Sequence, residues 1–333
     1  MLNNKSLLIT GGTGSFGQML VKTIIRQFPK IKRLVIFSRD ELKQFDMSTK
    51  FSQKKYKFLR YYLGDIRDKS RLKRALEDID FVIHAAALKQ VVAAETNPNE
   101  FIQTNVIGAQ NLIDACLDQK VKKVIALSSD KAAAPINLYG ATKLCSDKLF
   151  IAANNYVGKR NLSFSVMRYG NVLGSRGSVL HVFNKRLKEK KPFEITDKRM
   201  TRFNLRLSQA VGTALWSLKN SIGGEIFVPK IPSFRIIDLA TSIDKKNKKI
   251  YTGIKRGEKL HEEMITSSDS YNTYDIGEFY AILPSHDKNF LKKYKNKFKK
   301  FKKVKDDFCY NSKTNKTFLS INGIKREILK YND

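Results

Sequence analysis

The first 170 residues alternate two hydrophobic patterns. Short runs rich in Val, Ile and Leu predict buried strands, and the stretches between them carry apolar residues every three or four positions, as amphipathic helices do. The predicted strands are Lys5–Thr10, Leu34–Ser38, Phe58–Leu63, Asp80–Ala85, Val124–Ser128 and Ser163–Arg168. The predicted helices are Ser15–Gln27 and segments near 68–77, 97–119 and 137–157. This alternation predicts parallel βαβ units and a doubly wound α/β sheet with helices on both faces.

After residue 170, glycines and prolines separate shorter elements. We therefore expect two domains: residues 1–170 hold the parallel sheet, and residues 171–333 form a smaller α/β domain. The second domain should pack against the carboxyl ends of the strands, where open sheets bind ligands. Aromatic residues recur at helical spacing among ten lysines in 288–305, which predicts one amphipathic helix packed on the core through that face. Contact with a membrane surface or nucleic acid is the alternative.

Composition narrows the function classes. The chain has 333 residues with 63 Lys and Arg against 31 Asp and Glu, a net charge of +32. This excess attracts anionic ligands in general, so it does not identify nucleic acid as a partner, and we expect none. The longest nearly apolar run, Phe81–Leu88, is too short to cross a bilayer, and the N-terminus lacks a signal-peptide pattern. We expect a soluble, cytoplasmic protein. Cys116, Cys145 and Cys309 are too scattered for a disulfide framework or zinc site, so no metal is expected.

A glycine-rich segment, Thr10–Gly17, follows the first predicted strand and opens the first predicted helix. Glycines at this spacing permit a tight turn and close approach of the backbone to a pyrophosphate, which then lies at the helix N-terminus. The context is that of a dinucleotide site. The residues expected to bind the phosphates are Gly11, Thr13, Gly14, Ser15, Phe16 and Gly17.

The end of the second strand indicates which dinucleotide binds. An acidic residue there would bind a ribose 2′-hydroxyl, but this chain has Ser38 and Arg39, with Lys43 nearby. A guanidinium can hold a 2′-phosphate, so NADP is favoured. NAD stays open, because Asp40 could reach the ribose. Further along the cofactor, the expected contacts are Asp65 and Ile66 near the adenine, and Ala85, Ala86 and Ala87 along the fourth strand.

Candidate catalytic residues follow the fifth strand. Tyr139 and Lys143 lie four apart, on one face of a predicted helix. The lysine charge favours the tyrosinate, so Tyr139 can accept a proton from a substrate hydroxyl as hydride leaves for the nicotinamide. Ser129, at the strand end, can hydrogen-bond the same oxygen. Tyr139 and Lys143 are also expected to contact the cofactor.

This combination resembles the extended short-chain dehydrogenase/reductase superfamily, whose fold is the Rossmann type. Longer stretches are similar to the inverting UDP-N-acetylglucosamine 4,6-dehydratases, the family that opens the pseudaminic acid pathway. The similar stretches are Ser38–Gln44, His84–Gln90, Asp130–Lys131, Pro135–Lys143, Arg168–Ser178, Asp197–Phe203, Gly224–Pro232 and Gly257–Glu263. The resemblance extends to about residue 284 and implies a homo-oligomer.

In that family the sugar is oxidised at C4, which acidifies the proton on C5. A base removes this proton while an acid protonates the C6 hydroxyl, which leaves as water, and hydride returns to C6. The resemblance implies that Asp130 is the acid and Lys131 the base, with C5 reprotonated on the opposite face. Asp130 must therefore be protonated when it acts. Lys131 must be partly neutral at pH 7, so we expect nearby positive charge or burial to lower its pKa.

The same resemblance implies which residues contact the nucleotide sugar. The set is Lys89, Asn171, Val172, Gly174, Ser175, Arg176, Gly177, Ser178, Arg199, Arg202, Lys255 and Arg256. The two arginines Arg199 and Arg202 are suited to the diphosphate. The chain departs from the family at Ser129, where Thr is usual, at Ala134, where Asn is frequent, and at Lys255, which replaces an arginine. These departures bear on affinity more than on reaction type.

Two other functions stay open. A nucleotide-sugar 4-epimerase or reductase would need Tyr139 and Lys143 but not Lys131. A non-catalytic protein could instead use the basic surface to bind nucleic acid or an anionic membrane, with binding that falls steeply as salt rises.

Overall fold

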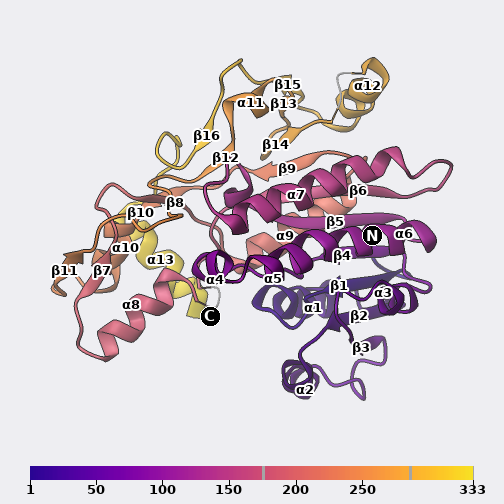
Figure 1. Cartoon of the computed structure of the whole chain (residues 1–333), viewed down its shortest axis with the longest axis horizontal. Coiled ribbons are helices and arrows are strands. Elements are labelled where there is room, and N and C mark those ends of the chain that lie inside the picture. Colours follow the sequence, from indigo (N-terminus) through magenta and orange to yellow (C-terminus); the bar gives the residue numbers. More distant parts are fainter. Residues whose placement is uncertain (175–176, 285–286, 333) are drawn as a thin grey trace.

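The computed structural model describes residues 1–174, 177–284 and 287–332. Its main feature is a sheet in the order β15-β13-β14-β9-β6-β5-β4-β1-β2-β3 (Figure 1). The strands are β1 Ser6–Thr10, β2 Arg33–Ser38, β3 Leu59–Leu63, β4 Phe81–His84, β5 Lys123–Ser129, β6 Ser163–Tyr169, β9 Ile226–Pro229, β13 Thr273–Asp275, β14 Phe279–Ile282 and β15 Lys302–Lys303. Strands β1 to β6 and β9 are parallel, which confirms the predicted doubly wound sheet. Strands β14, β13 and β15 continue it in antiparallel fashion.

Helices cover both faces of this sheet because successive strand residues point to opposite sides. In β1, Leu7 and Ile9 join one hydrophobic cluster and Leu8 the other. The first cluster contains residues of α1 (Ser15–Gln27) and α9 (Leu207–Asn220). The second contains residues of α3 (Lys69–Ala75), α6 (Gly108–Asp118) and α7 (Leu138–Ala152). The core is therefore a three-layer α/β/α arrangement, as the alternating pattern predicted.

Some helices differ from the predicted ones. The single helix expected over 97–119 is α5 (Pro98–Ile102), a π-helical turn (Gln103–Ile107) and α6. Two short helices, α2 (Glu41–Lys50) and α4 (Val91–Thr96), were not predicted. Large apolar side chains are exposed in both, Leu42 and Phe45 in α2 and Val92 in α4, so the apolar pattern of these helices does not mark a buried face.

The chain after residue 170 contributes to two parts of the structure. It forms a smaller cluster, and it also supplies β9 and the antiparallel strands of the large sheet, so the predicted boundary at residue 170 stays a prediction. The elements outside the large sheet are α8 Val179–Lys188, β7 Phe193–Ile195, β8 Thr201–Phe203, β10 Ser233–Arg235, α10 Ile236–Ile243, β11 Lys249–Tyr251, β12 Glu263–Ile265, α11 Ser267–Ser270, β16 Tyr310–Asn311 and α13 Ile321–Asn332.

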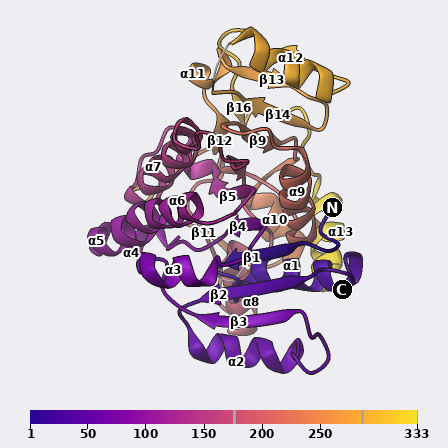
Figure 2. The ribbon, with the colours of Figure 1, turned by 90° about the vertical axis from the view of Figure 1, so that its right-hand side faces the viewer.

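The lysine-rich helix is shorter than predicted. Helix α12 spans Lys288–Lys297, and Phe298 then leaves it with an extended backbone toward β15. Tyr294 and Phe298 are buried in an aromatic cluster, and Phe301 stacks on Tyr274 with ring centroids 4.4 Å apart. The aromatic face thus packs on the core, but Phe301 reaches it from an extended segment. This module and α2 lie at opposite ends of the molecule (Figure 2).

Candidate active site

A cleft of about 830 Å³ follows the carboxyl ends of the parallel strands. Most residues of the predicted site form its wall. Those residues are Gly11, Thr13, Gly14, Ser15, Phe16, Ser38, Arg39, Asp40, Lys43, Asp65, Ile66, Ala85, Ala86, Ala87, Lys89, Ser129, Asp130, Lys131, Tyr139, Lys143, Asn171, Val172, Gly177, Ser178 and Arg202. The topology brings them together because the ends of parallel strands meet at one edge of a sheet.

The glycine-rich loop has the geometry of a phosphate cradle. Gly11 has φ +66°, and a Cβ on it would lie 2.8 Å from the Ala86 backbone, so only glycine fits there. Gly17 does not line the cleft: a Cβ on it would lie 2.1 Å from the Gly12 carbonyl oxygen, so it serves close packing of α1 on the loop. Helix α1 begins after Gly14 without a side-chain cap, which leaves its first N–H groups directed to the cleft end of the helix.

The end of β2 presents cations to the same cleft. The Arg39 side chain is 51% exposed, and its Nη1 is 3.9 Å from Asp65 Oδ2. Asp40 is the N-cap of α2: its Oδ1 accepts from the Lys43 backbone N–H at 2.9 Å, and its Oδ2 pairs with Lys43 Nζ. Hydrogen bonding to Lys43 lowers the pKa of Asp40. The Asp40 carboxylate therefore already has hydrogen-bond partners, the backbone N–H and the ammonium of Lys43.

The residues after β5 form a tight turn that carries two adjacent ionisable side chains, Asp130 and Lys131, into the wall of the cleft. Asp130–Ala132 is a 3-10 turn, in which Ser129 Oγ accepts from the Lys131 backbone N–H at 3.2 Å and donates to Asp130 Oδ1 at 3.0 Å. Helix α7 packs on this turn, where Gly140 is required because a Cβ would lie 2.3 Å from the Lys131 carbonyl oxygen. The start of α7 is capped by Asn137, whose Oδ1 accepts from the Gly140 N–H at 2.8 Å.

Tyr139 and Lys143 lie on α7 and both line the cleft. Lys143 is buried, and its Nζ donates to the Leu127 carbonyl oxygen at 2.8 Å. Burial lowers the pKa of Lys143. Burial also raises the pKa of Tyr139, and the main charge that opposes this increase is the ammonium of Lys131. The cation that acts most on the tyrosine is thus Lys131, whereas the sequence had suggested Lys143.

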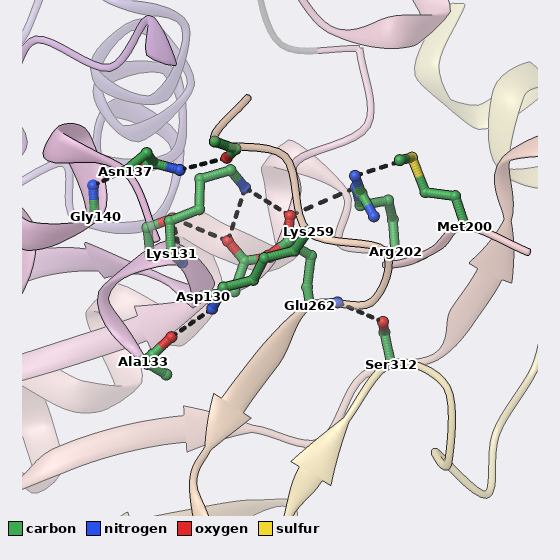
Figure 3. A network of polar contacts seen from close by, with 12 residues as sticks. Asp130, Lys131, Ala133, Asn137, Gly140, Met200, Arg202, Lys259, Glu262 and Ser312 are labelled. Atoms are coloured by element: carbon green, nitrogen blue, oxygen red, sulfur yellow. Dashed lines mark hydrogen bonds and ion pairs between the residues drawn. The ribbon is translucent and has the colours of Figure 1, made fainter. Parts of the chain in front are cut away.

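Lys131 lies in a buried ionic network (Figure 3). Its Nζ is 3.0 Å from Asp130 Oδ1 and 3.3 Å from Glu262 Oε1, and Arg202 Nε is 3.5 Å from the same Glu262 oxygen. The side chains of Asp130 and Glu262 are 1% and 3% exposed.

The network corrects one prediction. Burial disfavours the ammonium of Lys131, but the two carboxylates more than offset this effect and raise its pKa, so the expected lowered pKa is wrong. Burial raises the pKa of Asp130, as an acid requires.

Two cleft or near-cleft residues were not assigned roles from the sequence. Tyr169 ends β6 and lines the cleft, and burial raises its pKa. The sequence could have indicated Tyr169, because it lies at the end of a strand of the parallel sheet. Glu262 lies just before β12, far from Lys131 in the chain, and its presence in a recognised motif did not indicate what it contacts.

Other predicted substrate residues are placed differently. Arg202 lines the cleft and donates to the carbonyl oxygens of Thr201 and Leu260. Arg199 pairs with Asp197 at the surface, with a side chain 64% exposed. Gly174, Lys255 and Arg256 lie in the described part of the chain but off the cleft wall. Ser175 and Arg176 fall outside the described residues. The roles of all these residues stay predictions.

Three buried oxygens of cleft-lining residues have no hydrogen-bond partner among the described residues: Thr104 Oγ1, Asp130 Oδ2 and Asn171 Oδ1. Such acceptors are costly unless a ligand or water satisfies them, so the cleft fits a polar ligand. In 1–174, 177–284 and 287–332, no helix is long and apolar enough to span a bilayer. The same residues contain no group of three or more His, Cys, Asp or Glu that could hold a metal ion.

The parallel sheet, the glycine loop and the Ser129–Tyr139–Lys143 arrangement define a Rossmann-type protein of the short-chain dehydrogenase/reductase class. Comparisons with known proteins agree with this class. The model of a family described as polysaccharide biosynthesis protein matches residues 7–284, and the chain belongs to that family.

Three similar proteins are informative. A UDP-N-acetylglucosamine 4,6-dehydratase (inverting) from Campylobacter jejuni is 51% identical over 327 residues, which cover 96% of each protein. A UDP-glucose 4-epimerase from Rickettsia akari is 39% identical and covers 99% of this chain and 96% of its own length. The X-ray structure of Pen from Bacillus thuringiensis has a TM-score of 0.88 and 35% identity, and the match covers 100% of this chain and 99% of that one.

Proposed function

We propose that this chain is a UDP-N-acetylglucosamine 4,6-dehydratase that inverts C5. The observation that carries the proposal is the contact between Asp130 and Lys131 in the cleft, 3.0 Å apart and near Tyr139 in the same wall. Dehydration needs an acid and a base in addition to the tyrosine, and this pair supplies both groups. The 51% identity to the Campylobacter jejuni enzyme supports the same substrate and outcome.

The cofactor we propose is NADP. When bound, a nicotinamide dinucleotide supplies a hydride acceptor for C4 and a hydride donor for C6. The glycine loop would hold its pyrophosphate, and Arg39 and Lys43, which line the same cleft, would hold a 2′-phosphate. Asp40 has its carboxylate engaged by Lys43, which disfavours its use for a ribose hydroxyl and supports NADP over NAD.

The side chains of the site can accept and donate the protons that the elimination of water requires, so this step needs no external proton donor. Tyr139 accepts the proton of the C4 hydroxyl in its ionised form, which the Lys131 ammonium favours against the effect of burial on its pKa. Ser129, whose hydroxyl donates to Asp130 in the structure, would turn to hydrogen-bond the same sugar oxygen. Transfer of one proton from the Lys131 ammonium to the adjacent Asp130 carboxylate produces a neutral amine and a carboxylic acid together. The amine takes the C5 proton, and the acid protonates the C6 hydroxyl, which leaves as water.

Elimination therefore returns the pair to the ammonium and carboxylate observed in the structure. The raised pKa of Lys131 then describes the resting state, and the raised pKa of Asp130 makes the proton transfer less costly. When hydride returns to C6, C5 takes a proton that comes from solvent on the opposite face, which inverts that centre, and Tyr139 releases to solvent the proton that it took from the C4 hydroxyl.

The remaining parts of the proposal follow the family resemblance. Lys89, Asn171 and Arg202 lie in the cleft wall, where they can contact the nucleotide sugar. We propose that residues 1–170 bind the cofactor and that most of the later chain serves to bind the substrate. A pseudaminic acid type of pathway, a homo-oligomeric assembly and a cytoplasmic location are further implications.

The test is proton NMR of the purified protein with UDP-N-acetylglucosamine and NADP in heavy water. We expect a 4-keto-6-deoxy sugar with deuterium at C5 and no net consumption of cofactor. Lys131→Ala should lower the rate of water loss by about 10²–10⁴-fold, the usual contribution of a general acid or base. Lys198→Ala, at an exposed surface lysine, is the matched control. An unchanged sugar with the wild-type protein would falsify the proposal.

A nucleotide-sugar 4-epimerase is the second candidate, because the Rickettsia akari relative carries that name. An epimerase would invert C4, keep both C6 hydrogens and the C6 hydroxyl, and retain most of its activity in Lys131→Ala. The same NMR experiment separates the two functions.

A further inference from the structure

Glu262 contacts the site from a distant part of the chain. Its Oε1 lies 3.3 Å from Lys131 Nζ, and its side chain is 3% exposed. Figure 3 shows the lysine nitrogen joined to Asp130 and Glu262, while Arg202 approaches the glutamate from another direction. A carboxylate this deeply buried is strongly destabilising unless cations pair with it. Glu262 Oε2 has no hydrogen-bond partner among the described residues. Lys131 and Arg202 form ion pairs with this carboxylate, and the Lys259 ammonium also helps to balance its charge.

The backbone around Glu262 is fixed. Its N–H donates to Ser312 Oγ at 2.9 Å, and the Ser312 N–H donates back to the Glu262 carbonyl oxygen at 2.8 Å. The next residues form β12, which pairs with β16. The carboxylate is therefore delivered to Lys131 by a strand pair rather than by a mobile surface loop.

The same segment holds the turn that carries Lys131. Lys259 Nζ donates to the Ala133 carbonyl oxygen at 2.6 Å, and Asn137 Nδ2 donates to the Gly257 carbonyl oxygen at 2.8 Å. Together with the Glu262 contact, these bonds connect residues 257–262 at three points to residues 131–137, which comprise the end of the 3-10 turn and the segment that leads to α7. We propose, on the basis of the function given above, that Glu262 is a positioning residue that anchors the Lys131 ammonium in the resting site and sets the pH above which the Asp130–Lys131 pair loses the proton that it shares.

The charges around Lys131 give the direction of the effect. The groups that face it are Asp130, Glu262, Arg202, Tyr139, Lys89 and Lys259. Glu262→Gln keeps the shape of the side chain but removes its charge, so Arg202 is no longer balanced and disfavours the ammonium. The pKa of Lys131 must then fall, so the pair loses its shared proton to solvent at a lower pH, and Asp130 is left without the proton that it delivers to the C6 hydroxyl.

The readout is the pH dependence of turnover, followed by deuterium incorporation at C5 from UDP-N-acetylglucosamine in heavy water. In Glu262→Gln, the pH above which the rate falls should move down by about one unit or more, the shift typical of losing an opposite charge at this distance. Glu262→Asp keeps the charge on a shorter side chain, so it should keep the wild-type profile while its maximal rate falls. Glu263→Gln removes a neighbouring carboxylate that does not contact Lys131, and its profile should match the wild type.

The outcomes separate this inference from the proposed function. Wild-type protein that incorporates no deuterium at C5 contradicts the function itself. Active Glu262→Gln with an unshifted profile contradicts the role of Glu262 and leaves the function intact. If Glu262→Gln does not fold, Glu262→Asp decides: a wild-type profile with reduced rate supports the role, and a profile displaced from wild type overturns it.

Discussion

Arg39 is the residue whose replacement tests the choice of cofactor most directly. Its side chain is half exposed at the end of β2, and Nη1 is 3.9 Å from the carboxylate of Asp65. A hydrogen bond to a charged group contributes about 1.5–3 kcal/mol, and the exposure of Arg39 favours the lower end of this range. Since about 1.4 kcal/mol corresponds to a tenfold change in affinity, Arg39→Ala should weaken NADP binding about tenfold.

NAD lacks the 2′-phosphate, so its affinity should change little in the same variant. Lys43 cannot fully replace the guanidinium, because its ammonium already pairs with Asp40. The assay is isothermal titration of each oxidised dinucleotide into wild type, Arg39→Ala and the control Arg26→Ala, whose side chain is exposed at the end of α1. An equal loss of affinity for both dinucleotides, or wild-type protein that binds NAD more tightly, would refute the reasoning.

Three further predictions concern stability, each measured by urea denaturation. Asn105→Ala should lower the free energy of unfolding by about 2–3 kcal/mol, because the buried amide makes three hydrogen bonds, two of them to Leu88; a loss below about 0.5 kcal/mol contradicts this. Ala134→Gly should raise it by about 1 kcal/mol, since Ala134 has φ +43°, and an unchanged value would show that the strain is absent. Asp80→Asn should destabilise at pH 7. Burial opposes ionisation of Asp80, but hydrogen bonding to Lys122 lowers its pKa, so the carboxylate stabilises above its unfolded pKa and this contribution is lost as pH falls through the folded value. If the free energies of unfolding of wild type and Asp80→Asn differ as much at pH 3 as at pH 7, this pH dependence is contradicted.

Features set by local sequence were predictable. The glycine-rich loop after β1 and the polar residues at strand ends follow from short-range pattern, and the sheet topology then places them at one edge. For the same reason Ser129, Asp130 and Tyr139 could be located in advance.

Features that depend on contacts between distant segments were not predictable. The pKa of Lys131 was expected to fall because burial and cations were considered, whereas Glu262 reaches the lysine only through the pairing of β12 with β16. The predicted length of α12 was wrong for a related reason. Phe301 has helical spacing from Phe298, but it lies beyond the end of the helix and is packed through stacking on Tyr274. Spacing indicates which residues are buried, but it does not state which element buries them.

The order of strands in the large sheet has a consequence for synthesis of the protein. Strand β6 ends at Tyr169, and the strand that pairs with its free side, β9, begins at Ile226. A chain that folds as it leaves the ribosome therefore carries an open strand edge until that later segment emerges, and such edges promote association between chains. A nascent-chain chaperone would have its greatest benefit during this interval.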